Sequence, residues 1–220
     1  MFSRFAEFER GEAIVVGCDT AMGAGDYCVA QFLTRPLRTV DNPVQKLVYR
    51  SREAAPAMTD TLVEELEYIF KATGIKPIVA YERNNGGAFE MERLASLNKL
   101  HAFEVFRMPT VGRIDAPDAV RLGWDTNTVT RPAMLADLKD LIDRKAIRLA
   151  DPATVSELFS FVNVRTSTAI KAQAESNAHD DCIMALAIAW QVHKLSQRPV
   201  TDTQRVRARS AIAAAHAGLR

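Results

Sequence analysis

Four acidic residues stand at the boundaries of apolar segments that lie far apart in the sequence. Asp19 and Glu82 each directly follow a short apolar run. Asp180 and Asp181 directly precede a long apolar segment. Carboxylate oxygens are the ligands that Mg²⁺ and Mn²⁺ prefer in proteins, and three or four of them suit such an ion. If the fold brings these residues together, the sequence predicts a metal-dependent enzyme that acts on phosphate.

Each of these acids also has a purely structural explanation. An Asp after a strand can cap a turn, and Asp26, in the turn after Asp19, is interpreted as a turn residue rather than a ligand. An acid at a helix start is favoured by capping and by the helix dipole, which accounts for one of Asp180 and Asp181 but not for both. His179 directly precedes this pair, and would position water, assist proton transfer or lie in an outer layer around the metal.

Polar turns containing glycine follow both Asp19 and Glu82. Residues 83–87, with the sequence RNNGG, offer amides and backbone N–H groups that suit a phosphodiester. Arg83 could equally form an ordinary surface ion pair. The turn after Asp19 lets the backbone approach a ligand closely, but it lacks the GK[ST] ending of a P-loop. Neither turn identifies a ligand by itself.

The composition bounds the class of protein. With 220 residues, 48% hydrophobic and 25% charged, the chain suits one soluble α/β domain. A net charge of +1 means that any DNA-binding surface must be a local patch. The three cysteines lack CxxC spacing, which argues against a disulfide framework or a zinc site, and we expect Cys18 and Cys28 to pack as small hydrophobic residues. No segment predicts a membrane span or a signal peptide. Three histidines are expected on the surface: His101, His193 and His216.

Apolar periodicity then predicts the elements that position the acids. Strands are expected over residues 13–18, 27–33, 44–49, 78–81, 102–106 and 159–164, the first three as an antiparallel meander. Helices are expected over residues 58–72, capped by Thr59 or Asp60 and ended by Gly74; after Gly87, burying Phe89, Leu94 and Leu97; over 131–144; from Pro152, capped by Asp151; and over 181–195. Residues 108–130 and 165–179 are expected to be loops.

Taken in order, these motifs resemble the nuclease domain of tailed-phage terminase large subunits. The matching features are a strand ending in Asp19, the sequence ERNNG from Glu82, and HDD before an Ala/Leu-rich helix. The segments 123–127 and 130–135 and the pair Glu157-Leu158 are also similar. The resemblance covers about residues 12–195. It implies an RNase H-like fold, an α/β architecture with a mixed central sheet whose first three strands are antiparallel, flanked by helices.

The resemblance also implies an activity. A terminase nuclease is a metal-dependent endonuclease that cuts concatemeric viral double-stranded DNA in the cytoplasm of the infected bacterial host. Two ions, Mg²⁺ or Mn²⁺, would lie about 4 Å apart around the scissile phosphate. By motif position Asp19 would bridge both ions, Glu82 would hold one, and Asp180 or Asp181 the other. The choice within that pair stays open.

The remaining expectations concern DNA and partners. The family's large subunits carry an ATPase domain and work with a small terminase subunit and a portal; because this sequence has no Walker A motif, we interpret residues 1–197 as an excised nuclease domain. Residues 198–220 form a basic tail, either flexible or in contact with DNA or a packaging partner. Alternatives are a Holliday-junction resolvase, a transposase core, or a non-catalytic DNA-binding or motor-docking module. The residues expected to hold the DNA backbone are Arg83, Asn84, Asn85, Arg113, Arg121 and Arg131.

Overall fold

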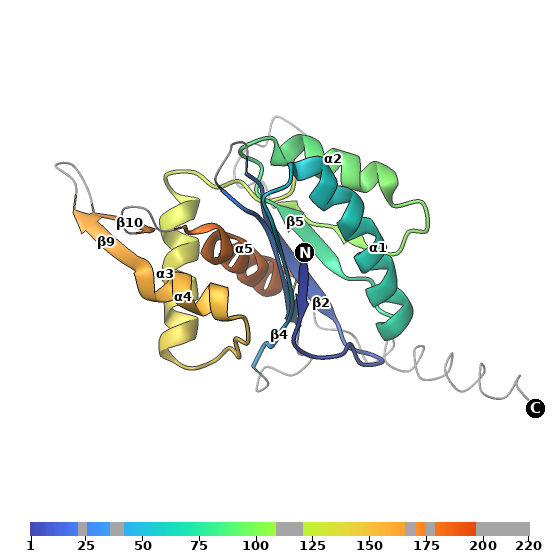
Figure 1. The fold of residues 1–220 in the computed structure, drawn as a ribbon, viewed down its shortest axis with the longest axis horizontal. Coiled ribbons are helices and arrows are strands. Elements are labelled where there is room, and N and C mark those ends of the chain that lie inside the picture. Colours follow the sequence, from blue (N-terminus) through green and yellow to red (C-terminus); the bar gives the residue numbers. More distant parts are fainter. Residues whose placement is uncertain (22–25, 36–41, 109–120, 166–169, 175–178, 197–220) are drawn as a thin grey trace, which may run out of the picture.

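The protein is a mixed sheet covered by helices on both faces (Figure 1). The computed structural model describes residues 1–21, 26–35, 42–108, 121–165, 170–174 and 179–196. The helices are α1 (Ala55–Thr73), α2 (Gly87–Leu97), α3 (Thr130–Asp143), α4 (Pro152–Ser160) and α5 (Asp181–Leu195). The strands are β1 (Phe2–Arg4), β2 (Ile14–Asp19), β3 (Cys28–Thr34), β4 (Gln45–Ser51), β5 (Ile78–Tyr81), β6 (Glu104–Val105), β7 (Arg107–Met108), β8 (Arg121–Leu122), β9 (Phe161–Arg165) and β10 (Ile170–Ala174).

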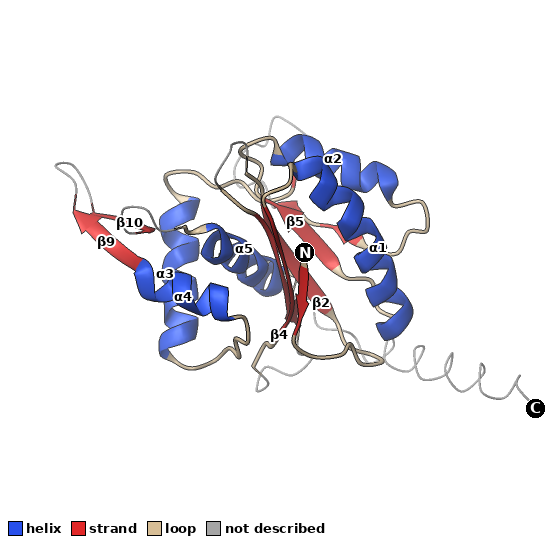
Figure 2. Ribbon diagram, in the orientation of Figure 1, coloured by secondary structure: helices blue, strands red, loops and turns tan. Residues whose placement is uncertain are grey.

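The central sheet has the strand order β1-β4-β3-β2-β5-β6 in the described part of the chain. Strands β2, β3 and β4 are antiparallel neighbours, whereas β5 lies parallel to β2 and β6 parallel to β5. The predicted antiparallel meander and the predicted mixed α/β fold are therefore confirmed. Figure 2 shows α1 and α2 on one face of this sheet and α5 on the other.

Strand β2 lies between two hydrophobic cores, and its alternate residues point into one core or the other. Ile14 and Val16 pack in the core under α1 and α2. Val15 packs with residues of α3 and α5 on the opposite face. Every residue of β2 is buried, which explains its continuous apolar sequence and places its last residue, Asp19, at the carboxyl edge of the sheet.

Helix α5 packs unusually close to the sheet. A Cβ atom on Gly17 of β2 would lie 2.2 Å from the backbone nitrogen of Ala189 and 2.3 Å from the carbonyl oxygen of Ala185. The close approach therefore requires both the glycine and the small residues of the helix. This contact fixes the direction of α5, so that its first residue, Asp181, comes to the sheet edge where β2 and β5 end. The predicted bounds of α5, residues 181–195, are confirmed.

Several local predictions also hold. Asp151 caps α4, with its side chain accepting a hydrogen bond from the backbone N–H of Thr154 at 2.9 Å. Gly74 ends α1 with a left-handed φ of 73°. Cys18 and Cys28 are buried in the core.

No helix in the described ranges is both long enough and apolar enough to cross a membrane.

Helix α1 and helix α2 differ from the prediction. Helix α1 begins at Ala55, with a proline in its first turn, so the predicted cap Thr59 lies inside the helix and its hydroxyl lies 3.0 Å from the hydroxyl of Tyr81. In α2, Phe89 is exposed and Met91 is buried in its place. The helix starts from Gly86 in a left-handed conformation, which turns this face toward the sheet.

One strand was missed, and two further predictions are wrong. Strand β1 was not expected, although it pairs antiparallel with β4 at the edge of the sheet. The predicted loop 165–179 contains β10, which forms a two-stranded antiparallel ribbon with β9. His193 is buried rather than exposed, because α5 is covered on nearly all sides, and its ring stacks on Trp190 with centroids 4.8 Å apart. Burial lowers the pKa of His193 to about 4.

Candidate functional site

A cleft of about 1440 Å³ lies at the sheet edge where β2 and β5 end and α5 begins. Its walls are completed by α3 and by the segment before it. The acids that sequence analysis selected from distant segments therefore share one cavity. The predicted site residues that line it are Asp19, Glu82, Asn84, Asn85, Arg131, His179, Asp180 and Asp181.

Asp19 and Glu82 form the buried floor of the cleft. Both are less than a tenth exposed, and the backbone N–H of Glu82 bonds to the carbonyl oxygen of Cys18 at 2.8 Å, which holds the two acids side by side. Burial raises the pKa of Asp19 well above its usual range; a hydrogen bond with Glu82 and the charges of Glu82, Asp181 and Asp180 add to this. Without a cation, the acids of this site are therefore electrostatically unfavourable when all are ionised.

Asp180 and Asp181 have different environments. Asp181 is buried, and its Oδ2 accepts a hydrogen bond from the backbone N–H of Tyr27 at 3.0 Å. Burial raises the pKa of Asp181 to about 6, and the charges of neighbouring acids act in the same direction. Asp180 is more exposed, and its Oδ2 accepts a hydrogen bond from Arg131 at 2.9 Å. Asp181 therefore has the buried, charge-crowded carboxylate of the pair.

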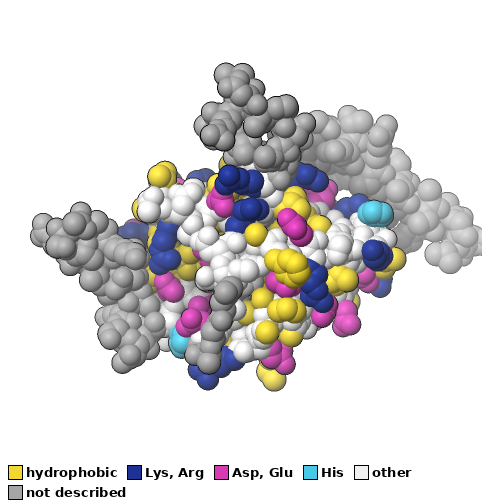
Figure 3. Space-filling model, turned by 90° about the horizontal axis from the view of Figure 1, so that it is seen from above, with side chains coloured by type: hydrophobic (Ala, Val, Ile, Leu, Met, Phe, Trp, Pro, Cys, Tyr) yellow, Lys and Arg dark blue, Asp and Glu magenta, His cyan; other side chains and the backbone are white. Residues whose placement is uncertain are grey.

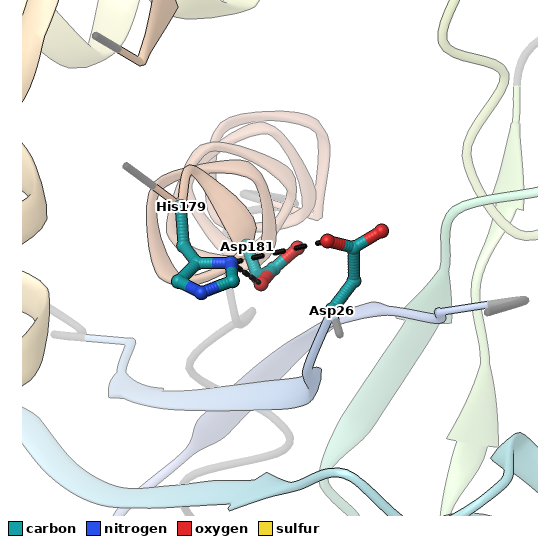
Figure 4. A group of neighbouring side chains, drawn as sticks. All are labelled: Asp26, His179 and Asp181. Carbon is teal, nitrogen blue, oxygen red and sulfur yellow. Dashed lines mark ion pairs between the residues drawn. The ribbon is translucent and has the colours of Figure 1, made fainter. Parts of the chain in front are cut away.

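A further acid, Asp26, joins this site. His179 Nδ1 lies 3.6 Å from Asp181 Oδ2 and 3.9 Å from Asp26 Oδ1. One ligand atom from each of the three residues falls within 4.8 Å of the other two, and Figure 4 shows the side chains directed toward one another. From the sequence, Asp26 is expected to be a turn residue rather than a ligand. The available signal was its place before β3, because an antiparallel hairpin returns its second strand to the edge where the first ends.

The turn after Glu82 positions that carboxylate. Asn84 Nδ2 donates to Glu82 Oε1 at 3.2 Å and to the carbonyl oxygen of Thr126 at 2.9 Å. A Cβ atom at Gly87 would lie 1.8 Å from the carbonyl oxygen of Glu82, so only glycine fits where the chain folds back into α2. The asparagine that was predicted to hold DNA therefore has a contact with a candidate metal ligand.

The arginines predicted to contact DNA already have partners in the protein. Arg83 and Arg121 share Asp125, at 3.1 and 2.7 Å. Arg131 pairs with Asp180, and Arg113 lies outside the described residues. Among the described residues visible in Figure 3, Lys and Arg side chains are interspersed with acidic ones and form no continuous basic stripe. This mixture agrees with the near-neutral net charge of +1.

Comparison with known proteins rests on structure. The sequence matches no protein-family model and no curated protein. The fold is similar to that of the large terminase nuclease from thermophilic phage G20c with bound magnesium, with a TM-score of 0.61, 16% identity and 86% of each chain covered. It is also similar to the P22 large terminase nuclease domain, with a TM-score of 0.51, 15% identity and 87% of each chain covered. The chain has the fold of a terminase nuclease domain.

The terminase nuclease fold extends beyond phages. The manganese-soaked human cytomegalovirus terminase nuclease domain matches with a TM-score of 0.54 and 9% identity, covering 81% of this chain and 82% of that one. The mixed central sheet flanked by helices agrees with the architecture that the resemblance implied. At such low identity the likeness concerns the arrangement of the elements, and the roles of individual residues must be argued from the cleft itself.

Proposed function

We propose that this protein is a divalent-metal-dependent endonuclease that cuts double-stranded DNA, and that it serves as the nuclease of a viral genome-packaging terminase. The observation that carries this proposal is the convergence of Asp19, Glu82 and Asp181 in one cleft at the carboxyl edge of a terminase nuclease fold. The fold alone would not suffice, because one fold hosts many activities.

The donor set fits a hard divalent cation. Asp19, Glu82 and Asp181 supply carboxylate oxygens, and His179 and Asp26 extend the set on the side of α5. Oxygen-rich sites of this kind suit Mg²⁺ and Mn²⁺, and the imidazole is compatible with Mn²⁺. The solved nucleases with this fold include magnesium-bound, cobalt-bound and manganese-soaked forms. A cation would also offset the burial and the mutual repulsion of the acids, which together raise the pKa of Asp19.

The residues divide the work as follows. Asp181 is buried and lies close to His179, whereas Asp180 pairs with Arg131, so we assign Asp181 rather than Asp180 as the ligand from the start of α5. Asp19 and Glu82 would complete the ligand set. When bound, a divalent ion would supply an acidified water and charge stabilisation for the departing oxygen. His179, which lies beside Asp26 and Asp181, would orient water or accept a proton there.

The DNA backbone would lie along the mouth of the cleft. Arg131 is placed to exchange its contact with Asp180 for a phosphate, which its planar guanidinium matches well. The side chains of Arg83, Arg121 and Asn84 hold the adjoining turns in place, so we assign them a supporting role. Asn85, Arg113 and the basic tail 198–220 remain candidates for further phosphate contacts.

The wider context is part of the proposal. In a complete terminase the domain 1–197 would be joined to an ATPase domain and would act with a small subunit and a portal in the cytoplasm of the infected bacterial cell. Cleavage would then resolve concatemeric DNA at the start and end of packaging. Preference for branched substrates over linear duplex would instead indicate a resolvase with the same fold.

Plasmid cleavage tests the proposal. With Mn²⁺ or Mg²⁺ the wild-type protein should nick and linearise supercoiled DNA, and EDTA should stop the reaction. Asp181→Asn should lower the rate at least about 100-fold, since loss of a ligand exceeds the usual effect of changing an outer contact. Asp140→Asn is the matched control, because this acid is exposed on α3 and pairs with Arg144. Equal rates for wild type and Asp181→Asn would overturn the assignment, and absence of metal-dependent cleavage would overturn the function.

A further inference from the structure

Two arginines converge on one tyrosine ring at the rim of the cleft. The guanidinium carbon of Arg50, in β4, lies 3.7 Å from the centre of the Tyr27 ring, and that of Arg52 lies 4.6 Å from it. Tyr27 also contacts two residues of the candidate metal site, His179 and Asp181. Its ring meets the His179 imidazole edge-on, with centroids 5.2 Å apart, and its backbone N–H donates to Asp181. The stack is thus directly attached to the candidate metal centre.

The positive charge of this stack is only partly balanced. Among the described residues, Arg50 has one ion pair, to Glu157 Oε1 at 3.6 Å, which is too long for a good hydrogen bond. Its Nε is buried and has no hydrogen-bond partner in that part of the chain. The other oxygen of Glu157 accepts the backbone N–H of Cys182 at 2.8 Å. Arg52 makes no ion pair within the described ranges of the chain. Arg52 is exposed and the side chain of Arg50 is 30% exposed, so an anion from solvent can reach this stack.

A second arginine–aromatic contact in the same protein provides the contrast. Arg4 lies 5.1 Å from the ring centres of both Phe8 and Tyr68. Its guanidinium is neutralised by Glu65 at 2.7 Å. Arg4 thus follows the usual pattern of a structural arginine, in which a carboxylate takes the charge. In the described part of the chain, the stack on Tyr27 holds two cations around one ring with one ion-paired acid, Glu157.

Like charges so close together repel, and an anion placed against both would relieve the repulsion. Guanidinium groups match phosphate oxygens in geometry, and stacking on an aromatic ring fixes their orientation in advance. The acids of the cleft repel an anion, but bound divalent cations would neutralise them and remove this repulsion. On a DNA strand whose scissile phosphate lies in the cleft, the next phosphodiester along the strand is the anion that would lie beside these arginines.

We propose that Tyr27, Arg50 and Arg52 form a phosphodiester-binding site that holds the DNA strand as it leaves the cleft past His179. The inference rests on the proposed function, because the ligand is the same DNA. It adds a wall of the binding surface that lies on β4, opposite the turn after Glu82. It also links DNA binding to the acids, because Tyr27 contacts Asp181 through its backbone and His179 through its ring.

Fluorescence anisotropy on a labelled duplex, measured over a range of salt concentrations with Mn²⁺ and in an Asp19→Asn background that prevents cutting, tests this site. Arg52→Gln should weaken binding roughly tenfold and should lower the slope of log affinity against log salt by about 0.9, the value for one phosphate contact. Arg52→Lys should keep the slope, because the charge remains, and lose part of the affinity. Arg4→Gln is the matched control and should leave both quantities unchanged.

The outcomes separate the two proposals. If wild type cleaves DNA and Arg52→Gln binds with the affinity and slope of Arg4→Gln, the rim site is refuted and the nuclease stands. If Arg52→Gln instead lowers the melting temperature or the Mn²⁺-induced rise in melting temperature without changing the salt slope, the stack only supports the fold, which also refutes the site. If the melting temperature of the wild type rises with Mn²⁺ but the protein neither binds nor cuts DNA, the proposed function is refuted, and the rim site is refuted as well.

Discussion

Replacing Asp181 by Asn should make the metal-free protein more stable while removing metal binding. The pKa of Asp181 is raised from its usual 3.8 to about 6, which corresponds to roughly 3 kcal/mol of destabilisation of the folded state once the acid is ionised. Because the cleft is open to solvent, screening lowers this destabilisation to about 1–2 kcal/mol. Loss of the favourable charge at the start of α5 costs about 0.3–1 kcal/mol. The net gain should be about 1 kcal/mol.

The sign of this effect depends on pH. An acid with a raised folded-state pKa destabilises the fold above that pKa, and the penalty disappears as the pH falls toward 3.8. Asp181→Asn should therefore raise the melting temperature by about 2–4 °C at pH 8 in EDTA and have little effect near pH 4. The amide oxygen can still accept the N–H of Tyr27, so the local fold should persist.

The assay is thermal unfolding of wild type and Asp181→Asn, with and without Mn²⁺, and with Asp140→Asn as the control for a neutralised surface acid. Wild type and the control should gain stability with Mn²⁺, whereas Asp181→Asn should not. If metal-free Asp181→Asn is less stable than wild type at pH 8, or if its stability responds to Mn²⁺ as wild type does, the Asp181 carboxylate is not electrostatically destabilised in favour of metal binding.

Three further predictions concern other parts of the molecule. Gly17→Ala should destabilise the protein by about 3 kcal/mol in urea unfolding, because its Cβ would meet the backbone of α5 at 2.2 Å; a loss below about 0.5 kcal/mol would contradict the packing. Asn84→Ala should lower the affinity for Mn²⁺ about 10-fold or more in calorimetry, since it removes the donor to Glu82; unchanged affinity would refute that role. The pKa of His193 is lowered to about 4 in the folded protein, so the unfolded chain takes up this proton first as the pH falls. The free energy of unfolding should therefore decrease by up to about 3 kcal/mol between pH 6.5 and pH 4. His193→Gln should flatten that part of the stability curve, and an unchanged curve would refute this.

Much of the fold could be predicted because its strongest signals are local. Strand β2 is apolar throughout because it is buried on both faces, and its acid necessarily lies at the strand end. Helix α5 combines acids at its start with small residues in its body, and both features are visible in the sequence. Asp151 and Gly74 are placed by capping rules that involve a single turn of chain.

The features that could not be predicted depend on contacts between distant segments. Asp26 joins the site because β3 returns beside β2 and because α5 begins nearby, 155 residues later in the chain than Asp26 (181 minus 26). Strand β10 has little local preference for extended structure and forms by pairing with β9. The burial of His193 had one signal, since a helix that is apolar nearly all round is enclosed by its neighbours.

The choice between Asp180 and Asp181 also needed the fold. The two residues are adjacent, so composition and spacing treat them alike. In the structure, the backbone of Tyr27 and the crowding of acids single out Asp181, while Arg131 contacts Asp180. Neither partner could be identified from the sequence, because Tyr27 is separated from Asp181 by 154 positions.

Anomalous diffraction from crystals soaked in Mn²⁺ tests the central claim most directly, because it places the ion without reference to activity. We predict a peak in the cleft with carboxylate oxygens of Asp19, Glu82 and Asp181 among its ligands, and a second peak toward His179 and Asp26 if two ions bind. Manganese bound only outside this cleft, or no peak at all at a concentration that supports cleavage, would contradict the account.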